Sequence, residues 1–538
     1  MKTYADGAVE VHHADCLDVL RAMPDASVDS VVCDPPYGLA DHHPRVIEAA
    51  LRAWLNGDRE HVPDGKGFMG REWDRFVPPP AVWDECLRVL KPGGHLLAFA
   101  APRTADLMTM SIRLAGFEIR DSINWVFAQG FPKGQDLGKS IDRMRADRAD
   151  VLQVTAWLNA ARLAAGVTHK QIDTEFGFNG MASHWTTLKG KAAIIPTDEQ
   201  WDRLQLLLGF GDEMTAEVRR LNARKGSVGE NFAAREVIGS RHAGLSSGNG
   251  SIFLRGASGR DERGHVAVTS AASEAAHRWQ GWNTTLKPAH EPIVVARKST
   301  GFNSVVANVL EHDTGGLNID GCRIPGRDRT DYGLGIATRS RGATFGAPSL
   351  SADFDSDKGR WPTNVVMSHA PLGDVDGQVD GDACVAGCVP GCPVAEVDQQ
   401  SGTTTSRSAQ PRSGKAGAGW RTTHTGAEYD DAGGASRFLP VFRFETKASS
   451  GERPRGVDGT RHVSVKPLGL IRWLVRLVTP PGGTVVDPFL GSGTTAEACV
   501  IEGFRCIGME NHAPYLSLID ARLSKPLQPA LDLFGGAA

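Results

Sequence analysis

The stretch that decides the fold reads TVVDPFLGSGTT, residues 484–495. A short β-branched run ends at Asp487, a glycine-rich loop follows, and a helical pattern begins at Thr494. Between a strand and a helix, glycines let the backbone approach a ligand, and the helix N-terminus favours an anionic group. Taken alone, such a loop is more often a plain tight turn, so its neighbours must decide the interpretation.

The neighbours complete one half of a nucleotide-binding α/β fold. Residues 467–478 predict an amphipathic helix, 494–502 a second helix and 505–509 a strand. Glu510 ends that strand, at the position from which an acidic side chain reaches ribose hydroxyls in such folds. The segment therefore predicts a pocket for an adenosine-containing cofactor.

The other half of the sheet lies near the N-terminus. Apolar and amphipathic runs alternate there as in a doubly wound sheet that lacks its phosphate loop. The predicted strands are residues 9–12, 28–33, 95–100 and 117–127, the predicted helices are 17–23, 83–90 and 106–115, and a turn is expected at 91–94.

The strand at residues 28–33 is followed by Asp34-Pro35-Pro36-Tyr37. Ligands of open α/β sheets bind at the carboxyl ends of strands. The Asp34 carboxylate and the Pro35 carbonyl can each accept one hydrogen of an amino group, and Tyr37 can stack on a base swung out of a duplex. If this tetrapeptide stood alone in the sequence, an ordinary loop turn would be the alternative interpretation.

The two motifs in this order, with Lys466-Pro467 before the last amphipathic helix, resemble the DNA amino-methyltransferases of the circularly permuted β group. The resemblance covers about residues 9–130, 286–299 and 461–526. It implies an α/β fold: a Rossmann-like class I S-adenosylmethionine-dependent methyltransferase sheet, circularly permuted, with a helical insertion and a loop-rich recognition region.

The resemblance also implies roles for single residues. Asp34, Pro35, Pro36 and Tyr37 would act on the target base. The implied S-adenosylmethionine residues are Asp15, Lys466, Asp487, Phe489, Gly491, Ser492, Gly493, Thr494 and Glu510, with Glu510 on the ribose, Lys466 at the methionine carboxylate and Asp15 near the adenine. His462-Val463-Ser464 departs from the family's usual His-Pro-Thr lead-in.

The activity that the resemblance implies is site-specific methylation of double-stranded DNA, as in restriction-modification systems. Aspartate at position 34 resembles the adenine-N6 enzymes, because cytosine-N4 enzymes usually have serine there. Cytosine-N4 methylation remains the alternative within this class. A sequence-specific DNA-binding regulator with a vestigial catalytic domain is the alternative outside it.

Residues 131–285 read as a helical insertion before the edge strand of residues 286–299. Helical blocks at 156–167, 168–176 and 181–188 resemble a helix-turn-helix unit, and a small bundle packed on the core is the alternative. Residues 300–460 read as a loop-rich target-recognition region, 461–526 as the cofactor-binding half and 527–538 as a flexible tail. Insertions of this style resemble DNA methylases of phages and prophages.

The loop-rich region contains a possible metal site. A histidine precedes a Cys-x3-Cys-x3-Cys pattern, and four such ligands can close a tetrahedral zinc site that organises a segment poor in apolar residues. The alternative is scattered cysteines in a reducing compartment. The four residues are His369, Cys384, Cys388 and Cys392.

Composition sets wider limits. The formal net charge of −4 gives no overall basic footprint, so DNA contacts require local Arg and Lys clusters. The N-terminal residues lack a secretory pattern and no apolar run is long enough for a bilayer, which predicts a cytoplasmic protein without a membrane partner. Leu531-Asp532-Leu533-Phe534 resembles the peptides that bind the bacterial sliding clamp, or else docks on the protein's own surface.

Overall fold

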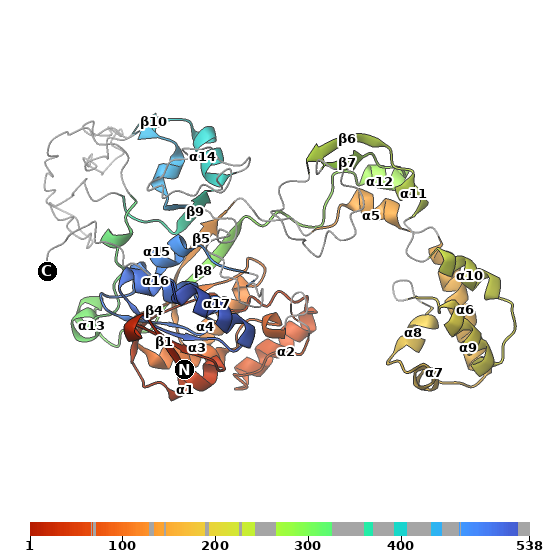
Figure 1. Ribbon diagram of the computed structural model, residues 1–538, viewed down its shortest axis with the longest axis horizontal. Coiled ribbons are helices and arrows are strands. Elements are labelled where there is room, and N and C mark those ends of the chain that lie inside the picture. The colour runs from red at the N-terminus through yellow and green to blue at the C-terminus, as the bar shows by residue number, and fades with distance from the viewer. Residues whose placement is uncertain are drawn as a thin grey trace, which may run out of the picture. The chain divides into compact units, whose positions relative to one another are not determined.

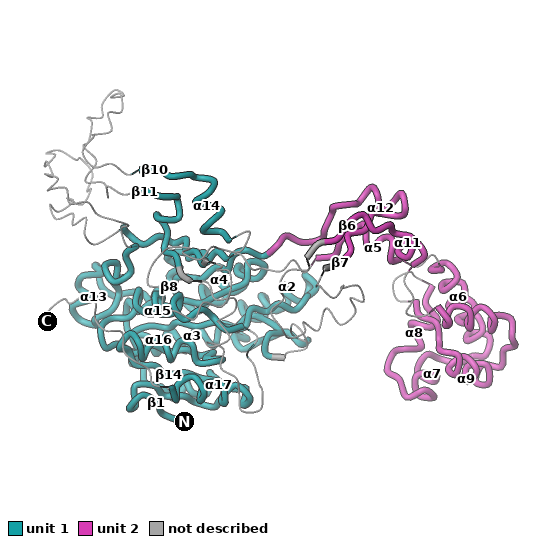
Figure 2. The backbone as a smooth tube through the Cα atoms, turned by 45° about the horizontal axis from the view of Figure 1, so that its top comes forward, with its two compact units in different colours: residues 1–130, 288–538 teal, residues 131–287 magenta. Residues whose placement is uncertain are grey.

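The computed structural model describes residues 1–65, 67, 72–127, 134–144, 147–188, 193–224, 229–242, 265–324, 360–369, 392–405, 432–443, 462 and 464–525. The chain forms two compact units (Figure 2). Unit 1 comprises Met1–Gly130 and Pro288–Ala538, and unit 2 is Phe131–Lys287.

Unit 1 is built on a ten-stranded sheet (Figure 1). Its strands in spatial order are β1 (Lys2–Tyr4), β2 (Val9–His12), β14 (Arg505–Met509), β13 (Thr484–Asp487), β3 (Val28–Cys33), β4 (Leu90–Phe99), β8 (His290–Arg297), β5 (Glu118–Val126), β9 (Val365–His369) and β12 (Val441–Arg443).

The strand directions bring distant parts of the sequence to one edge. Strands β2, β14, β13, β3 and β4 are parallel, so the residues that follow them meet at the same edge of the sheet. Strand β8 is antiparallel to β4, with Phe99 opposite Ile293. The beginning of β8 therefore lies at the edge where β3 and β13 end.

Helices cover both faces of this sheet. Core residues of α15 (Leu468–Val478), α16 (Thr494–Glu502) and α17 (Ala513–Leu523) share one cluster with Val32 of β3. Val31 and Cys33 of the same strand belong to the opposite cluster, because successive side chains of a strand point to opposite faces. That second cluster includes residues of α1 (Cys16–Ala22), α2 (Pro44–Leu55), α3 (Pro80–Val89) and α4 (Ala105–Leu114).

The strands and helices that the sequence predicts in the two core halves are confirmed, with three corrections. Residues 91–94 do not form a separate turn but lie within β4, where the register jumps from Val28↔Leu90 to Ser30↔His95. Helix α2 was not predicted. The expected edge strand at residues 286–299 forms β8 inside the sheet, because β5, β9 and β12 continue the sheet beyond it.

The region expected to be loop-rich also contains regular structure. Helix α13 packs on β4, and helix α14 packs on β9. The described elements there are α13 (Val305–His312), α14 (Pro393–Ser401) and a short pair of strands, β10 (Thr404–Thr405) and β11 (Ala432–Gly433), besides β9 and β12.

Unit 2 contains a helical bundle with its own core, centred on Leu158, Trp201 and Leu204. Its helices confirm the predicted helical blocks and add two more. They are α6 (Arg148–Ala164), α7 (His169–Phe176), α8 (Met181–Trp185), α9 (Asp198–Leu208) and α10 (Thr215–Ala223).

The rest of unit 2 is a small α+β element. A buried ion pair joins Arg235 to Asp142, which also accepts hydrogen bonds from the Ser273 hydroxyl and backbone. The elements are α5 (Leu137–Arg143), α11 (Glu230–Ala233), α12 (Glu274–Arg278) and the antiparallel pair β6 (Val237–His242) and β7 (His265–Thr269). Within the described ranges of the whole chain, no helix has the length and apolarity to cross a membrane.

Candidate active site

The loop after β3 is held by hydrogen bonds to its backbone. The Tyr37 and Gly38 amides both donate to Asp74 Oδ1 at 2.9 Å, and the Thr104 hydroxyl donates to the Tyr37 carbonyl at 2.6 Å. Gly38 has φ +64°, and a Cβ there would lie 2.6 Å from the Val77 amide nitrogen. Only glycine fits this position, so the loop geometry is fixed by the backbone.

Three charged side chains meet around Tyr37. Its hydroxyl oxygen lies 2.8 Å from Asp34 Oδ1 and 2.9 Å from Glu291 Oε2. Lys466 Nζ donates to Asp34 Oδ2 at 2.6 Å and to the Ser464 hydroxyl at 3.1 Å, and it lies 3.5 Å from Glu291 Oε2. We call Asp34, Tyr37, Glu291 and Lys466 the carboxylate cluster.

Burial and charge fix the protonation states of two members of this cluster. Burial opposes the charge of Lys466, but Asp34 and Glu291 outweigh it, and the net effect raises the pKa of the ammonium group. Burial, followed by the charges of Asp34 and Glu291, raises the pKa of the Tyr37 hydroxyl well above its usual value. Lys466 is therefore a cation at neutral pH, and Tyr37 keeps its proton.

The glycine loop follows β13 and contacts the end of β14. Gly491 and Gly493 have φ of +56° and +82°, and the Leu490 amide donates to the Met509 carbonyl at 2.9 Å. A Cβ on Gly491 would lie 3.1 Å from His462 Nε2. The bare backbone at Gly491 thus borders an imidazole ring, at the point where α16 is about to begin.

Two buried carboxyl groups flank this loop. Asp487 Oδ1 accepts a hydrogen bond from the Phe489 amide at 2.9 Å, and Glu510 accepts from the amides of Gly491 and His512 at 2.9 and 2.7 Å. Burial raises the pKa of each carboxyl to about 7. Asp34 also raises the pKa of Asp487 through its charge, so the two motifs interact electrostatically.

The remaining predicted cofactor residues lie at the same edge or on the loop. Asp15 is exposed after β2 and caps α1 by accepting from the Leu17 amide at 2.9 Å. The rings of Phe489 and Trp83 pack edge to face, with their centroids 6.2 Å apart. The Ser492 and Thr494 hydroxyls lie 3.3 Å apart.

The sequence was compared with known proteins. Residues 265–521 match the family model N6_N4_Mtase, described as DNA methylase. Three Type II methyltransferases are similar over short stretches. M.BamHI of Bacillus amyloliquefaciens is 30% identical over 95 residues, which are 18% of this chain and 18% of that protein, and M.ScaI of Streptomyces caespitosus is 33% identical over 82 residues, which are 15% of this chain and 27% of that protein. M.SmaI of Serratia marcescens is 40% identical over 62 residues, which are 12% of this chain and 21% of that protein.

The chain spans between 18% and 27% of the length of these relatives. Among solved structures, the M1.HpyAVI–SAM complex has a TM-score of 0.29 at 10% identity, covering 96% of this chain and 99% of that chain. The cytosine-N4-specific PvuII DNA methyltransferase has a TM-score of 0.34 at 9% identity, covering 98% and 91%.

The sequence did not predict a place in this candidate site for three residues: Glu291, Asp74 and His462. Glu291 lies near the start of β8, before the apolar run of that strand, and the antiparallel pairing of β8 with β4 brings it to Tyr37. Asp74 lies in a short 3₁₀ helix, Glu72–Asp74, far from any motif. An acidic residue at the start of a predicted strand was the single signal available for Glu291.

Lys466 has a partner that the family resemblance does not imply. That resemblance puts Lys466 at the methionine carboxylate of the cofactor, whereas its ammonium group binds the Asp34 carboxylate. Lys466 is 5% exposed in this arrangement. The assignment to the cofactor stays a prediction.

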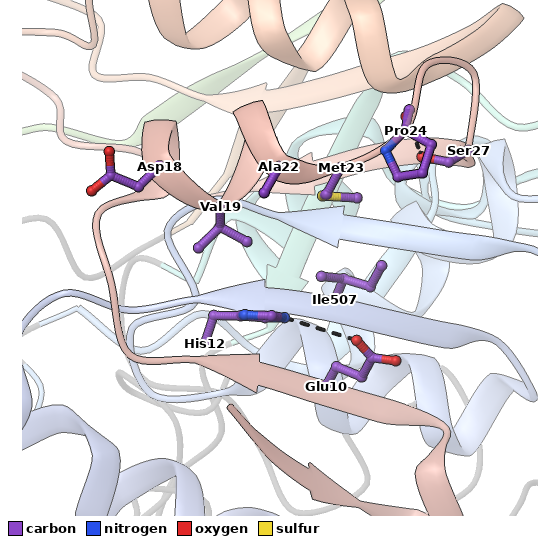
Figure 3. A pocket seen from close by; sticks show the side chains of 9 residues that line it. All are labelled: Glu10, His12, Asp18, Val19, Ala22, Met23, Pro24, Ser27 and Ile507. Carbon is purple, nitrogen blue, oxygen red and sulfur yellow. Dashed lines mark hydrogen bonds and ion pairs between the residues drawn. The ribbon is translucent and has the colours of Figure 1, made fainter.

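A separate hollow of about 480 Å³ lies between α1 and the sheet (Figure 3). Val19 and Ala22 of α1 and Met23, which follows the helix, face Ile507 of β14, with Glu10 and His12 of β2 beside them. None of the predicted catalytic or cofactor residues lines it. We therefore do not assign it to the candidate active site.

Two of the four proposed zinc ligands lie outside the described residues. Cys384 and Cys388 lie there, as does Leu531–Phe534, the segment expected to bind a sliding clamp. Cys392 is buried and precedes α14, and His369 ends β9. Among the residues that the structure describes, no group of three or more His, Cys, Asp or Glu side chains is placed to hold a metal ion.

Proposed function

We propose that the protein is a site-specific DNA methyltransferase that transfers the methyl group of S-adenosylmethionine to the N6 amino group of adenine. The observation that carries this proposal is the position of Asp34 at the end of β3, beside the end of its parallel neighbour β13, where the glycine loop begins. A base amino group held at Asp34 and a cofactor held at the loop would meet at one edge of the sheet.

The loop residues fit an adenosine-containing cation. Gly491 and Gly493 present backbone without side chains, and Glu510 keeps lone pairs for ribose hydroxyls while backbone amides hold its carboxylate in place. The acidic groups Asp34, Asp487 and Glu510 favour a positive charge at this edge. When bound, S-adenosylmethionine supplies an electrophilic methyl group on a positively charged sulfur.

The loop after β3 would hold the target base. Asp34 and the Pro35 carbonyl accept the two amino hydrogens, which draws the nitrogen lone pair out of conjugation with the ring. The Tyr37 ring supports a base that has left the duplex stack. Asp74 and Thr104 fix the Tyr37 backbone on both sides, so this geometry exists before the base arrives.

We further propose that α7 and α8 of unit 2 read DNA. Asp173 fixes the turn between them, because its carboxylate accepts from the amides of Gly180 at 3.0 Å and Ala182 at 2.9 Å. Residues 176–191 contain no Asp or Glu, which suits approach to phosphates. Residues 300–460 are proposed as a second recognition region, and residues 531–534 as a sliding-clamp ligand.

Nucleoside mass spectrometry of DNA methylated by the purified protein tests this proposal. N6-methyladenine is the expected product, and N4-methylcytosine would assign the alternative target. Cofactor-free protein that binds one DNA sequence tightly and methylates none would instead support a DNA-binding regulator. Single-molecule sequencing of DNA from expressing cells would give the sequence context of the modified base.

A further inference from the structure

The Tyr37 hydroxyl lies between two carboxylates. Its oxygen is 2.8 Å from Asp34 Oδ1 and 2.9 Å from Glu291 Oε2, both hydrogen-bond distances. A hydroxyl has one hydrogen to donate, and an ionised carboxylate can only accept. Both contacts are full hydrogen bonds only when one more proton lies on one of the two carboxyl groups.

The charges of the four side chains do not cancel when both carboxyl groups are ionised. Asp34 and Glu291 carry two negative charges when ionised, and Lys466 supplies one positive charge. One negative charge therefore remains without a cationic partner among these four side chains. A single added proton makes the cluster neutral.

Lys466 lies closer to one carboxylate of the cluster than to the other. Its ammonium nitrogen lies 2.6 Å from Asp34 but 3.5 Å from Glu291. A nearby cation favours the ionised form of a carboxyl group, and the effect weakens with distance. The positive charge of Lys466 is therefore held mainly by Asp34, and Glu291 is the more distant carboxylate.

We propose that Glu291 is the proton acceptor of the methylation reaction and is reached from Asp34 through the Tyr37 hydroxyl. This inference rests on the proposed amino-methyltransferase function and adds a role that no sequence motif assigns to Glu291.

Methylation leaves one proton that must depart from the amino nitrogen. The amino nitrogen bonds to the methyl carbon while the carbon–sulfur bond of the donor breaks and leaves its electron pair on sulfur. The nitrogen, now positively charged, releases one proton to Asp34. That proton passes to the Tyr37 oxygen as the Tyr37 hydroxyl proton passes to Glu291, which restores the Asp34 carboxylate. Glu291, whose side chain is 24% exposed, then releases the proton to water.

Single-turnover methylation by Glu291→Gln, Tyr37→Phe and the double variant tests the path. General acid–base groups contribute roughly 10²–10⁴-fold. We expect each single variant to slow the chemical step by roughly 10²-fold, with little change in the affinity for S-adenosylmethionine or DNA. The double variant should be no slower than the slower single variant, because both changes interrupt one path.

The matched control is Glu118→Gln. Glu118 lies on β5 opposite Arg297, at the far end of β8 from Glu291, and it should keep the wild-type rate. A wild-type rate for Glu291→Gln would overturn the proposal. Fully multiplicative losses in the double variant would also overturn it, because Tyr37 and Glu291 would then act separately.

Chemical rescue separates a proton acceptor from a merely structural residue. Formate should restore part of the rate of Glu291→Ala but not that of the Tyr37→Phe Glu291→Ala variant, whose hydroxyl link is missing. No rescue of Glu291→Ala, or equal rescue of both, contradicts the path. If the wild-type protein binds its cofactor and DNA but methylates neither base, the proposed function itself has failed, which is a different outcome.

Discussion

Gly38 fixes the loop that carries the candidate active site. Its φ of +64° is costly for other residues by about 1–2 kcal/mol, and a Cβ would lie 2.6 Å from the Val77 amide nitrogen. The Gly38 amide also donates to Asp74, next to the Tyr37 amide that does the same. A change at Gly38 therefore disturbs both the backbone and the position of Tyr37.

We predict that Gly38→Ala lowers the free energy of unfolding by about 2–5 kcal/mol, from left-handed strain and overpacking together. The control is Gly57→Ala, where φ is +99° but no atom lies within 4 Å of the new Cβ. That variant should lose only about 1–2 kcal/mol. Denaturant unfolding measures both, and equal losses would mean that the contact with Val77 has no effect.

Asp487 makes stability depend on pH. Burial raises its pKa to about 7 from the ordinary value of 3.8, so between these pH values the unfolded chain loses its proton before the folded chain does. The stabilisation linked to this carboxyl is complete below about pH 4 and is lost as the pH rises through about 7.

Asp487→Asn cannot ionise and should remove this dependence. Relative to wild type, the variant should gain about 1–3 kcal/mol of stability between pH 5 and pH 8, since each unit of pKa difference corresponds to about 1.4 kcal/mol. Urea unfolding of both proteins at the two pH values measures the change. Parallel pH profiles would show that Asp487 ionises normally in the folded protein.

At the scale of single elements, helix α15 shows why amphipathic patterns are predictable. Seven of its eleven residues are buried, and its two arginines, Arg472 and Arg476, both bind Glu502 of α16. The apolar stripe faces the sheet and the charged face binds the next helix, so one pattern in the sequence serves both contacts.

We predict that Leu474→Ala in α15 costs about 2–5 kcal/mol of stability, because Leu474 is fully buried. The matched control is Leu310→Ala in α13, where the side chain is 83% exposed and the expected change is within about 0.5 kcal/mol. Thermal or denaturant unfolding decides between them. Similar costs for the two substitutions would mean that α15 does not pack on the sheet in this way.

Elements with local signals could be predicted from the sequence, and those fixed by distant partners could not. The predicted strand at residues 28–33 became β3, because all six residues are buried and four are apolar. Residues 91–94 looked like a turn because they contain Lys-Pro-Gly-Gly, yet Gly93 with φ +81° lets β4 bulge and continue. Pairing with β3 decides that outcome, and a local pattern does not contain it.

The candidate site follows the same rule. Asp34 and Asp487 each follow a recognisable strand, so their proximity could be expected from parallel order alone. Glu291 comes from an antiparallel strand 257 residues further along the chain than Asp34, and its contact with Tyr37 depends on the whole sheet. Lys466 was assigned by resemblance, and the sequence held no signal for its contact with Asp34.

At the scale of the whole molecule, the chain leaves unit 1 for unit 2 and returns to it at neighbouring points of the sheet. Val126 of β5 pairs with His290 of β8, and the Phe127 amide donates to the Ala289 carbonyl at 2.9 Å. A short turn can therefore join the two strands as an ordinary antiparallel hairpin.

We predict that replacing residues 131–287 with a short Asn-Gly turn leaves unit 1 folded and its affinity for S-adenosylmethionine unchanged. Its sequence preference across a random DNA pool should weaken or be lost, because α7 and α8 are absent. Trp201→Ala, which removes a buried side chain from the core of the bundle, is the milder companion variant. An unchanged preference in both would exclude DNA reading by unit 2, and loss of cofactor binding would show that unit 1 depends on it.

The most direct test of the proposed chemistry is mass spectrometry of nucleosides from a host that lacks DNA methyltransferases of its own. Cells expressing the wild-type protein should accumulate N6-methyladenine, and cells expressing Asp34→Ala should not, although the purified variant should still bind S-adenosylmethionine. Methylated adenine from the Asp34→Ala variant, or no methylated base from a wild-type protein that is folded and binds its cofactor, would contradict the assignment of Asp34 to the target amino group.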